Sequence, residues 1–302
     1  MITVFGSINM DLIATTARLP KPGETVEGNG FSTAAGGKGA NQALAATRAG
    51  ATVRMAGAVG SDSFAAEALA LMREAGTDLS TVKTADLPTG TAHILVGGDG
   101  ENMIVVVAGA NGTMTDEDAR NTVAALSPGD TLVLQLEIPT GAVETALNEA
   151  RERGIRSIIN IAPLTEHAAA LGRMAAIVVA NETEFERLAG RDRLSVDERE
   201  VAMRTLVEET GQTVIVTLGA EGVVALHEGS FFRAAGLVIE PVDTVGAGDT
   251  FCGYLAAGLD AGLPFQDALS RAAAAGSLAC LKPGAQPSIP LASEVNAALG
   301  RL

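Results

Sequence analysis

The stretch "GKGANQALAATRAGATVRMAGAVGSDSFAAEALALMREAG", residues 37–76, contains the pattern that decides the fold. Residues 37–50 carry small apolar side chains at helical spacing and end at Gly50, a typical helix stop. Residues 52–60 form a short run typical of a buried strand, and residues 63–76 form a second amphipathic helix pattern. Strands that alternate with helices in this way predict a mostly parallel sheet covered on both faces.

The same alternation continues on both sides of this stretch. "ITVFG" at residues 2–6 has the β-branched, glycine-terminated pattern of a first buried strand. Ser195 and Glu198 are spaced as a capping box that opens a helix. Because no internal repeat or Pro/Ser-rich linker occurs, we expect residues 1–302 to form one continuous domain. Further strands are expected at 130–137, 156–160, 175–181 and 213–219, and further helices at about 140–153, 182–189, 247–259 and 264–281.

One segment interrupts the alternation. Residues 91–107 contain two strand-like runs around the glycine-rich segment 97–100, which is typical of a hairpin. A hairpin inserted into a series of strands and helices is expected to lie outside the main sheet. A lid over a site, or a contact between subunits, is its natural use.

The composition limits the classes of partner. The 302 residues carry a formal net charge of −15, without a cluster of Lys and Arg that could neutralise a nucleic-acid backbone. Aromatic residues make up 3% and Trp is absent, which disfavours stacking on nucleobases. An anionic ligand stays compatible with this charge, because backbone N–H groups and bound metals supply local positive potential.

The cysteines and the N-terminus indicate the compartment. Cys252 and Cys280 are too few for a disulfide scaffold, so we expect small apolar side chains in a reducing environment. No basic residue precedes Arg18, unlike in a signal peptide, and no apolar run reaches the ~18 residues of a membrane span. We therefore expect a cytoplasmic protein without a membrane or nucleic-acid partner.

The stretch "DTVGAGDTF" at residues 243–251 places a Gly-Ala-Gly turn between two carboxylates, directly before a helix pattern. Gly246, Ala247 and Gly248 are expected to present backbone N–H groups to an anion at the helix start. Asp249 would stand beside that anion, where a carboxylate can accept the proton of an attacking hydroxyl during phosphoryl transfer. The alternative is an ordinary helix cap.

Two common glycine motifs do not fit this sequence. The dinucleotide motif GxGxxG requires a third glycine where Phe251 stands. A Walker A loop requires Ser or Thr after its lysine, whereas Gly39 follows Lys38. The segment "GGKGAN" at 36–41 instead allows a close backbone approach to a polar ligand, and Asn41 offers an amide to hydroxyl groups. A tight turn with a surface lysine is the alternative.

Polar residues also follow two of the expected strands. Asn9 and Asp11 in "GSINMDL" come after the first strand, at the carboxyl end where open α/β sheets bind ligands, although such residues also serve in turns. Asn181 and Glu184 in "NETE" lie three residues apart on one helix face. They suit a Mg²⁺ ion that keeps several waters, or a helix cap with a solvated glutamate.

The segments "GSINMDL", "GGKGAN", "NETE", "TLGAEG" and "DTVGAGDTF", in this order, resemble the motifs of the ribokinase (PfkB) family of carbohydrate kinases. The resemblance runs from Gly6 to about Pro290, and the ordered set is far more specific than any one motif. It implies an α/β fold of three layers, α/β/α, with a central, mostly parallel sheet and a small β-sheet lid from about 12–33 and 90–108. In this family such lids pair across a homodimer.

The resemblance also implies roles for the motif residues. Asp249 would be the base that takes the proton from the 5-hydroxyl of a sugar, and the turn before it would be the anion hole. The sugar pocket would be lined by Asn9, Asp11, Gly37, Lys38, Asn41, Glu137 and Asp249.

The same resemblance implies three cofactor sites. Asn181 and Glu184 would lie near Mg²⁺ and the phosphates of ATP. The nucleotide would be bordered by Thr217, Gly219, Gly222 and Gly248. Asp243 would bind a monovalent cation, usually K⁺, together with the carbonyls of Val245, Ala279, Lys282 and Gly284 and the hydroxyl of Ser288.

The function that follows is an ATP-dependent sugar kinase. The segments "GGKGANQA", "VAGAN" and "KPGAQPS" resemble most the family members that phosphorylate the 5-hydroxyl of D-ribose to give ribose 5-phosphate and ADP. A relative that acts on deoxyribose, fructose or a nucleoside is the first alternative, and sparse aromatics disfavour the nucleoside. A non-catalytic sugar-binding protein and a nicotinamide oxidoreductase are the others; the intact Asp249 turn and the missing fingerprint disfavour them.

Overall fold

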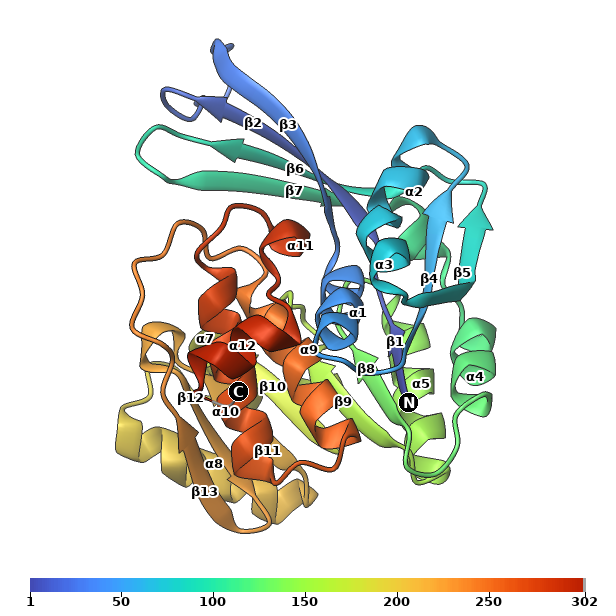
Figure 1. The fold of residues 1–302 in the computed structure, drawn as a ribbon, viewed down its shortest axis with the longest axis vertical. Helices are drawn as coiled ribbons and strands as arrows, with labels where there is room; N and C mark the ends of the chain where they lie inside the picture. The colour runs from blue at the N-terminus through green and yellow to red at the C-terminus, as the bar shows by residue number, and fades with distance from the viewer. Residues whose placement is uncertain (301–302) are drawn as a thin grey trace.

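The structure, a computed structural model, describes residues 1–300. A central sheet lies between two layers of helices, and a second, smaller sheet projects from one end of the molecule (Figure 1). The layered α/β arrangement expected from the sequence is therefore confirmed.

The central sheet has nine strands in the order β13-β12-β11-β10-β9-β8-β1-β4-β5. All neighbours from β11 to β5 pair in parallel, and the β11–β12 and β12–β13 pairs are antiparallel. The strands span β1 Ile2–Phe5, β4 Val53–Gly60, β5 Asp78–Ala85, β8 Thr131–Leu134, β9 Arg156–Asn160, β10 Ile177–Asn181, β11 Thr213–Thr217, β12 Val223–His227 and β13 Ser230–Ala234.

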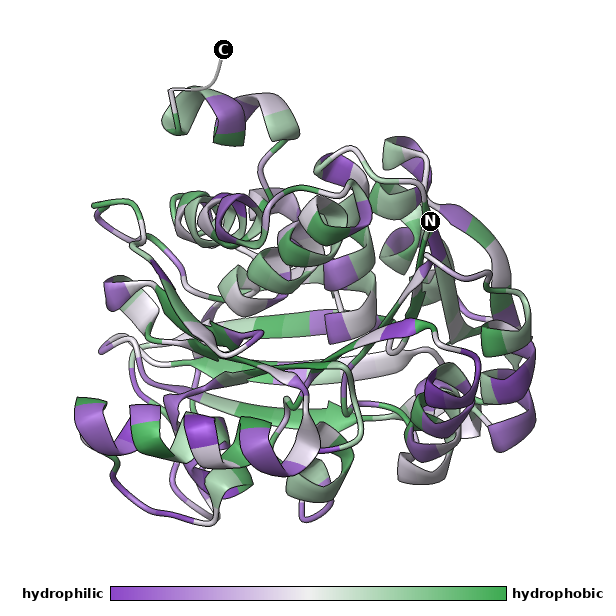
Figure 2. Ribbon diagram, turned by 90° about the horizontal axis from the view of Figure 1, so that it is seen from below, coloured by the Kyte–Doolittle hydropathy of each residue, from purple (hydrophilic) through white to green (hydrophobic). Residues whose placement is uncertain are grey.

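The helices divide between the two faces, and the apolar strands lie between them (Figure 2). One face packs against α1 Lys38–Arg48, α2 Ser63–Ala68, α3 Ala70–Ala75, α9 Ala247–Asp260, α10 Phe265–Ala279 and α12 Ala292–Ala298. The other face packs against α4 Asp116–Ala124, α5 Thr140–Glu152, α6 Ala168–Gly172, α7 Glu182–Ala189 and α8 Val196–Thr210. Short turns complete the chain as η1 Gly109–Thr113, η2 Gly219–Glu221 and α11 Ala285–Ser288.

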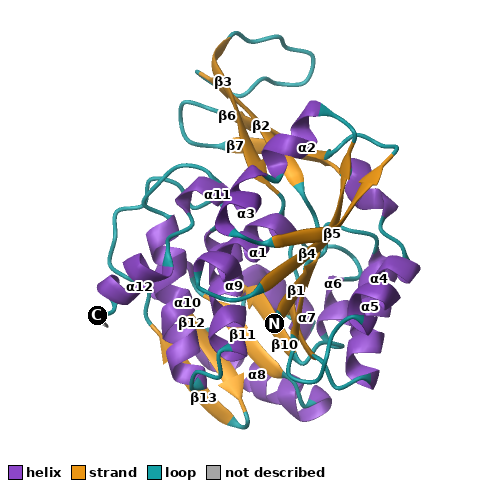
Figure 3. Ribbon diagram, turned by 45° about the vertical axis from the view of Figure 1, so that its right-hand side comes forward, coloured by secondary structure: helices purple, strands orange, loops and turns teal. Residues whose placement is uncertain are grey.

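The smaller sheet has four strands in the order β3-β2-β6-β7 and stands apart from the main sheet (Figure 3). Its strands are β2 Asn9–Thr16, β3 Gly28–Gly36, β6 Gly90–Val96 and β7 Asn102–Val107. The expected hairpin is confirmed as the antiparallel pair β6–β7, which lies outside the central sheet. Because only three residues separate β2 from the end of β1, the small sheet starts beside the carboxyl edge of the main one.

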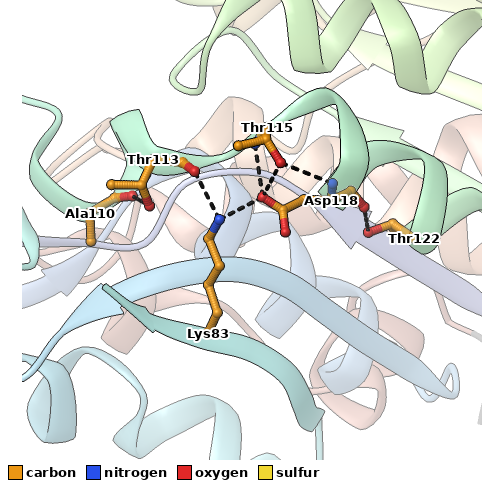
Figure 4. A network of polar contacts seen from close by, with 6 residues as sticks. All are labelled: Lys83, Ala110, Thr113, Thr115, Asp118 and Thr122. Atoms are coloured by element: carbon orange, nitrogen blue, oxygen red, sulfur yellow. Dashed lines mark hydrogen bonds and ion pairs between the residues drawn. The ribbon is translucent and has the colours of Figure 1, made fainter. Parts of the chain in front are cut away.

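Polar contacts connect β5, the edge strand of the central sheet, to the helix layer (Figure 4). The Lys83 Nζ on β5 lies 2.8 Å from Thr113 O and 2.5 Å from Asp118 Oδ2. The same carboxylate accepts from the backbone and hydroxyl of Thr115 and so caps α4. One lysine therefore fixes the edge strand, the η1 turn and the start of α4 relative to one another.

The structure departs from the sequence-based expectations in several places. Strand β5 and helices α4, α6 and α12 were not anticipated. The single helix expected at 63–76 is two helices that meet at Leu69. The strand expected at 130–137 ends at Leu134, which leaves residues 135–137 in the loop above the sheet. The antiparallel pair β12–β13 at one edge was not anticipated. Both cysteines are free, and in the described chain no helix is long and apolar enough to cross a membrane.

Candidate active site

Asp249 lies at the centre of the candidate site. It is in the first turn of α9, and its side chain is buried. The Asn41 Nδ2 donates to Asp249 Oδ2 over 2.9 Å, and the Gln42 Nε2 donates to Asp249 Oδ1 over 2.9 Å. Two neighbouring residues of α1 thus hold both oxygens of a carboxylate some 200 positions away in the chain.

The turn before Asp249 starts helix α9 at Gly246. Gly246, not Asp249, occupies the N-cap position of α9, so the cap alternative for the aspartate is wrong. Gly246 has a φ of 77°, and a side chain there would meet Ala285 at 2.9 Å, which makes glycine necessary. The Ala247 N–H donates to Thr244 O at 3.3 Å.

The following two amides complete the anion site. Within the described residues, the N–H groups of Gly248 and Asp249 have no hydrogen-bond acceptor. Nothing lies within 4 Å of the position that a Gly248 side chain would take, so the space beside its Cα is open. Free amides at a helix N-terminus attract an anion such as a phosphoryl group.

The expected sugar-binding residues gather next to this carboxylate. Asn9 opens β2 and accepts from Asn111 Nδ2 at 2.7 Å, which fixes its amide. The Glu137 carboxylate accepts from the Ser7 hydroxyl at 2.5 Å and from the Lys38 N–H at 3.0 Å.

Two side chains of this group have oxygens left for a ligand, Asn41 and Asp11. The Asn41 Oδ1 is buried and has no partner among the described residues. The Asp11 carboxylate accepts no hydrogen bond from them either, although the side chain is only 9% exposed. Its oxygens lie against Gly36, where a side chain would approach them to 2.5 Å. These oxygens are the acceptors that sugar hydroxyls require.

Charges in the site perturb one another. Burial, and then the carboxylates of Glu137 and Asp249, raise the pKa of Asp11 to about 7. The carboxylate of Asp249, followed by those of Glu137 and Glu184, raises the pKa of Lys38 against the opposing effect of burial. The "surface lysine" alternative for GGKGAN is therefore wrong, since this ammonium is half-buried within a group of carboxylates.

Asn181 and Glu184 form both a cap and part of the site. The Asn181 side chain caps α7 by accepting from the Glu184 N–H at 2.9 Å. The Glu184 carboxylate in turn accepts from the Asn181 N–H at 2.8 Å. Glu184 is 8% exposed, so the expected cap is confirmed but its glutamate is not solvated. Burial raises the pKa of Glu184, while the positive charge of Lys38 opposes that shift.

The residues expected to border the nucleotide lie one strand further along the sheet. Thr217, at the end of β11, is directly opposite Asn181 of β10. Gly219 and Gly222 follow in a turn, both with positive φ, and a side chain at Gly222 would collide with Ala234 O at 2.1 Å. These residues make no hydrogen bond to Asp249; they extend the row of strand ends beside it.

Asp243 joins two loops behind the anion turn. Its carboxylate accepts from the Val245 N–H at 3.0 Å and from the Gly284 N–H at 2.8 Å. The Ser288 hydroxyl is buried and donates to Ala285 O. Four backbone carbonyls in this region accept no hydrogen bond within the described residues: Val245, Ala279, Lys282 and Gly284. Carboxylate and carbonyl oxygens are the donors that hard cations prefer.

Sequence reasoning missed the buried amides that hold the ligand-facing side chains in place. Gln42 and Gln135 are fully buried and hydrogen-bonded to each other, and Asn111 orients Asn9. Gln42 and Gln135 each carried a weak signal, because each interrupts an apolar run. Their partners, and that of Asn111, lie 90 or more residues away in the chain, which no local pattern records.

Comparison with known proteins agrees with this geometry. The model of the pfkB family of carbohydrate kinases matches residues 1–292. The chain is 36% identical to the ribokinase of Haemophilus influenzae, covering 97% of this chain and 96% of that protein. It is 32% identical to a deoxyribokinase of Salmonella typhi, covering 98% and 97%. The structure of Arabidopsis thaliana ribokinase complexed with ribose and ATP superposes with a TM-score of 0.89 at 32% identity, covering 99% and 98%.

The chain belongs to the pfkB family of carbohydrate kinases. It is accordingly a phosphotransferase that uses an alcohol group as acceptor. Family membership agrees with a site in which hydroxyl acceptors, a buried carboxylate and free amides lie side by side.

The raised pKa of Asp11 predicts how stability depends on pH. A folded-state pKa of about 7 means that ionising this carboxyl disfavours the folded state progressively as pH rises from about 4 to 7. Asp11→Asn removes that cost, so the variant should be more stable than wild type at pH 8, by at most about 4 kcal/mol. The gain should shrink toward zero near pH 4 in urea unfolding.

Asp78 provides a control of opposite sign. Hydrogen bonds from Ser80 and Arg54 lower the pKa of Asp78 to about 2. Its ionised form therefore stabilises the fold, and Asp78→Asn should be less stable than wild type at pH 8, with a smaller loss as pH falls toward 2. A gain for Asp11→Asn that is the same at every pH would contradict the assigned burial of its charge.

Proposed function

We propose that the protein is an ATP-dependent kinase that phosphorylates the 5-hydroxyl of D-ribose, giving ribose 5-phosphate and ADP. The observation that carries this proposal is the buried Asp249 carboxylate, with free amides on one side and unpartnered sugar acceptors on the other. Support for the substrate comes from relatives named ribokinase at about 35% identity over almost their whole length.

The proposed reaction uses each group at a stated atom. Asp11, Asn9 and the free Asn41 Oδ1 receive the sugar hydroxyls. The 5-hydroxyl gives its proton to the Asp249 carboxylate while its oxygen bonds to the γ-phosphorus of ATP. The bond from that phosphorus to the bridging oxygen breaks, and ADP leaves with the electron pair. The amides of Gly248 and Asp249 stabilise the negative charge on the transferred group.

Mg²⁺ is part of the proposal at the end of β10. Glu184 would hold the ion through water, and the Asn181 cap fixes that side chain. Glu184 fits this role because burial raises its pKa and so disfavours its charge. A nearby cation would favour the ionised form and offset that effect. When bound, the ion neutralises charge on the phosphates of ATP.

K⁺ is proposed to bind behind the anion turn. Asp243, the Ser288 hydroxyl and the four unpaired carbonyls supply only oxygen donors, which suits this ion. Asp243 and Val245 are also in the loop that leads into the Gly246 turn. An ion there would keep the amides aimed at the phosphate before the reaction.

A second candidate substrate is 2-deoxyribose, favoured by the deoxyribokinase relative at 32% identity. The unpartnered Asp11 carboxylate favours ribose, because it can accept from two neighbouring hydroxyl groups. Fructose and nucleosides stay weaker alternatives. We place the activity in the cytoplasm, where ATP is available and the free thiols of Cys252 and Cys280 stay reduced.

The proposed reaction predicts a preference among sugars. ATP consumption should depend strictly on an added sugar, and kcat/KM should be about 10- to 100-fold higher for D-ribose than for 2-deoxy-D-ribose. The reason is the loss of one hydrogen bond to a charged acceptor, worth about 1.5–3 kcal/mol. Coupled assays over a panel of sugars and nucleosides, with phosphorus NMR of the product, measure this. Turnover without sugar, or a preference for a nucleoside, would contradict the proposal.

The ion site predicts a monovalent-cation dependence. Replacing K⁺ by Na⁺ or tetramethylammonium should lower kcat, and Asp243→Ala should abolish the difference between salts. K⁺ should also raise the melting temperature of the wild type, because an ion that binds only the folded state stabilises it. A wild-type enzyme with equal rates and melting temperatures in all three salts would rule the site out.

The small sheet is proposed to pair with a second copy as a homodimer. Phe31 is 70% exposed, and β7 exposes Met103, Ile104, Val105, Val106 and Val107 in one unbroken run. An apolar edge strand of this kind needs a cover. Val105 is on the face opposite Asp11, so Val105→Glu should halve the sedimentation mass, whereas Val201→Glu on α8 should not. A wild type of one-chain mass would contradict the dimer.

A further inference from the structure

We propose that Gln42, oriented by Gln135, is a positioning residue that holds the Asp249 carboxylate in the plane required for proton transfer. This inference rests on the proposed role of Asp249 as the base. It assigns a task to two buried glutamines to which neither the family resemblance nor the proposed chemistry gives a role.

The contacts form a short chain of amides. The Gln135 Nε2 donates to Gln42 Oε1 over 2.7 Å, and the Gln42 Nε2 donates to Asp249 Oδ1 over 2.9 Å. Asn160, at the end of β9, accepts a longer contact of 3.4 Å from the same Gln42 nitrogen. Gln42 and Gln135 both have no exposed surface, so water cannot replace either donor.

The direction of this chain is fixed by chemistry. An ionised carboxylate only accepts hydrogen bonds, so the Gln42 amide must turn its NH₂ group toward Asp249. Gln135 enforces that choice by donating to the Gln42 oxygen, because a reversed amide would place its nitrogen against the Gln135 donor. With both ends set, the Gln42 side chain has one orientation in which every donor finds an acceptor.

Burying Gln135 lowers the stability of the folded state. Its Oε1 is buried without a partner and lies where a side chain at Gly6 would be, 2.0 Å from that position. An unsatisfied buried acceptor disfavours the folded state, and an apolar side chain would avoid it. The chain nevertheless has a glutamine at this position, and Gly6 leaves the space for it. In return, the Gln135 amide donates a hydrogen bond to Gln42.

The two oxygens of Asp249 therefore have different surroundings. Oδ2 is held by Asn41, whose own oxygen is free for a sugar hydroxyl. Oδ1 is held by Gln42, which no ligand can reach. The terminal torsion of an aspartate is soft, and donors from two sides fix it. Loss of Gln42 should consequently impair the transfer step and leave sugar binding unchanged.

The first test replaces Gln42 by methionine, which has a similar length and no hydrogen-bonding amide. Gln42→Met should lower kcat about 10- to 100-fold, as expected for a small misplacement of a reacting group, with the KM values for sugar and ATP nearly unchanged. Gln135→Met should change kcat in the same direction and by less, because it leaves the Gln42 amide in place but free to turn.

Gln212 supplies a matched structural control. It is also buried, donates to Gly172 O at 2.9 Å and Ala175 O at 3.2 Å, and lies between α6 and β11. Gln212→Met should lower the melting temperature as Gln42→Met does, yet leave kcat unchanged. A kcat loss in both variants of equal size would reduce the effect of Gln42 to general destabilisation and overturn the proposal.

A second variant gives a readout that a merely structural role would not move. In Gln42→Glu, the introduced carboxyl can donate to Asp249 only when it is protonated. The ratio of its kcat to that of the wild type should therefore rise as pH falls from 8 to 5.5. A ratio independent of pH would overturn the proposal. This variant and Gln135→Met also carry the test if Gln42→Met fails to fold.

Asp249→Asn, assayed in parallel, distinguishes a failure of the proposed base from a failure of the role of Gln42. If Asp249→Asn keeps its activity, the proposed base is wrong and the positioning role fails with it. If Asp249→Asn is inactive while a folded Gln42→Met keeps kcat within about twofold of wild type, only the role of Gln42 is wrong. A rise in the sugar KM without a change in kcat would also overturn it, since Gln42 would then act on binding.

Discussion

The site depends on the close contact between α1 and α9. Gly253 makes this contact possible, because a side chain there would meet the Gln42 carbonyl and the Ala45 methyl at 2.5 Å. The two helices start at the same edge of the sheet, so their contact brings Asn41 and Gln42 to both oxygens of Asp249. Without it, the acid and the amides of its turn would have no fixed position relative to the sugar pocket.

The charges of the site are balanced around that contact. Three carboxylates, those of Asp249, Glu137 and Glu184, raise the pKa of Lys38. The positive charge of Lys38 in turn offsets part of the repulsion among these buried negative charges. Asp11 remains the exception, with its pKa raised to about 7 by burial first. A carboxylate kept partly desolvated, and without a donor, gains most from a ligand that supplies hydroxyl groups.

Much of this arrangement could be predicted from the sequence, and the reason is local. Several strands and helices near the site have their own period and a glycine at or just after their end, as β1 has at Gly6 and α1 at Gly50, and the Gly-Ala-Gly turn specifies its conformation within three residues. The rest depends on distant pairs. The Gln135–Gln42 bond spans 93 positions, and the break at Leu69 has no marker in the local pattern. The β12–β13 hairpin does have one that was overlooked, the two-residue turn Glu228-Gly229 between two apolar runs. Backbone carbonyls leave no sequence signature, so the oxygens around Asp243 were available only through the resemblance.

The central claim is that the Asp249 carboxylate, held between α1 and α9, accepts the proton of the sugar hydroxyl. The most direct test is a rapid-quench single turnover of wild type and Asp249→Asn, with sugar and ATP occupancy first matched by calorimetric titration. We expect equal occupancy and a phosphoryl-transfer step slower by about 10²–10⁴ in the variant. A transfer step of wild-type rate in the occupied variant would contradict it.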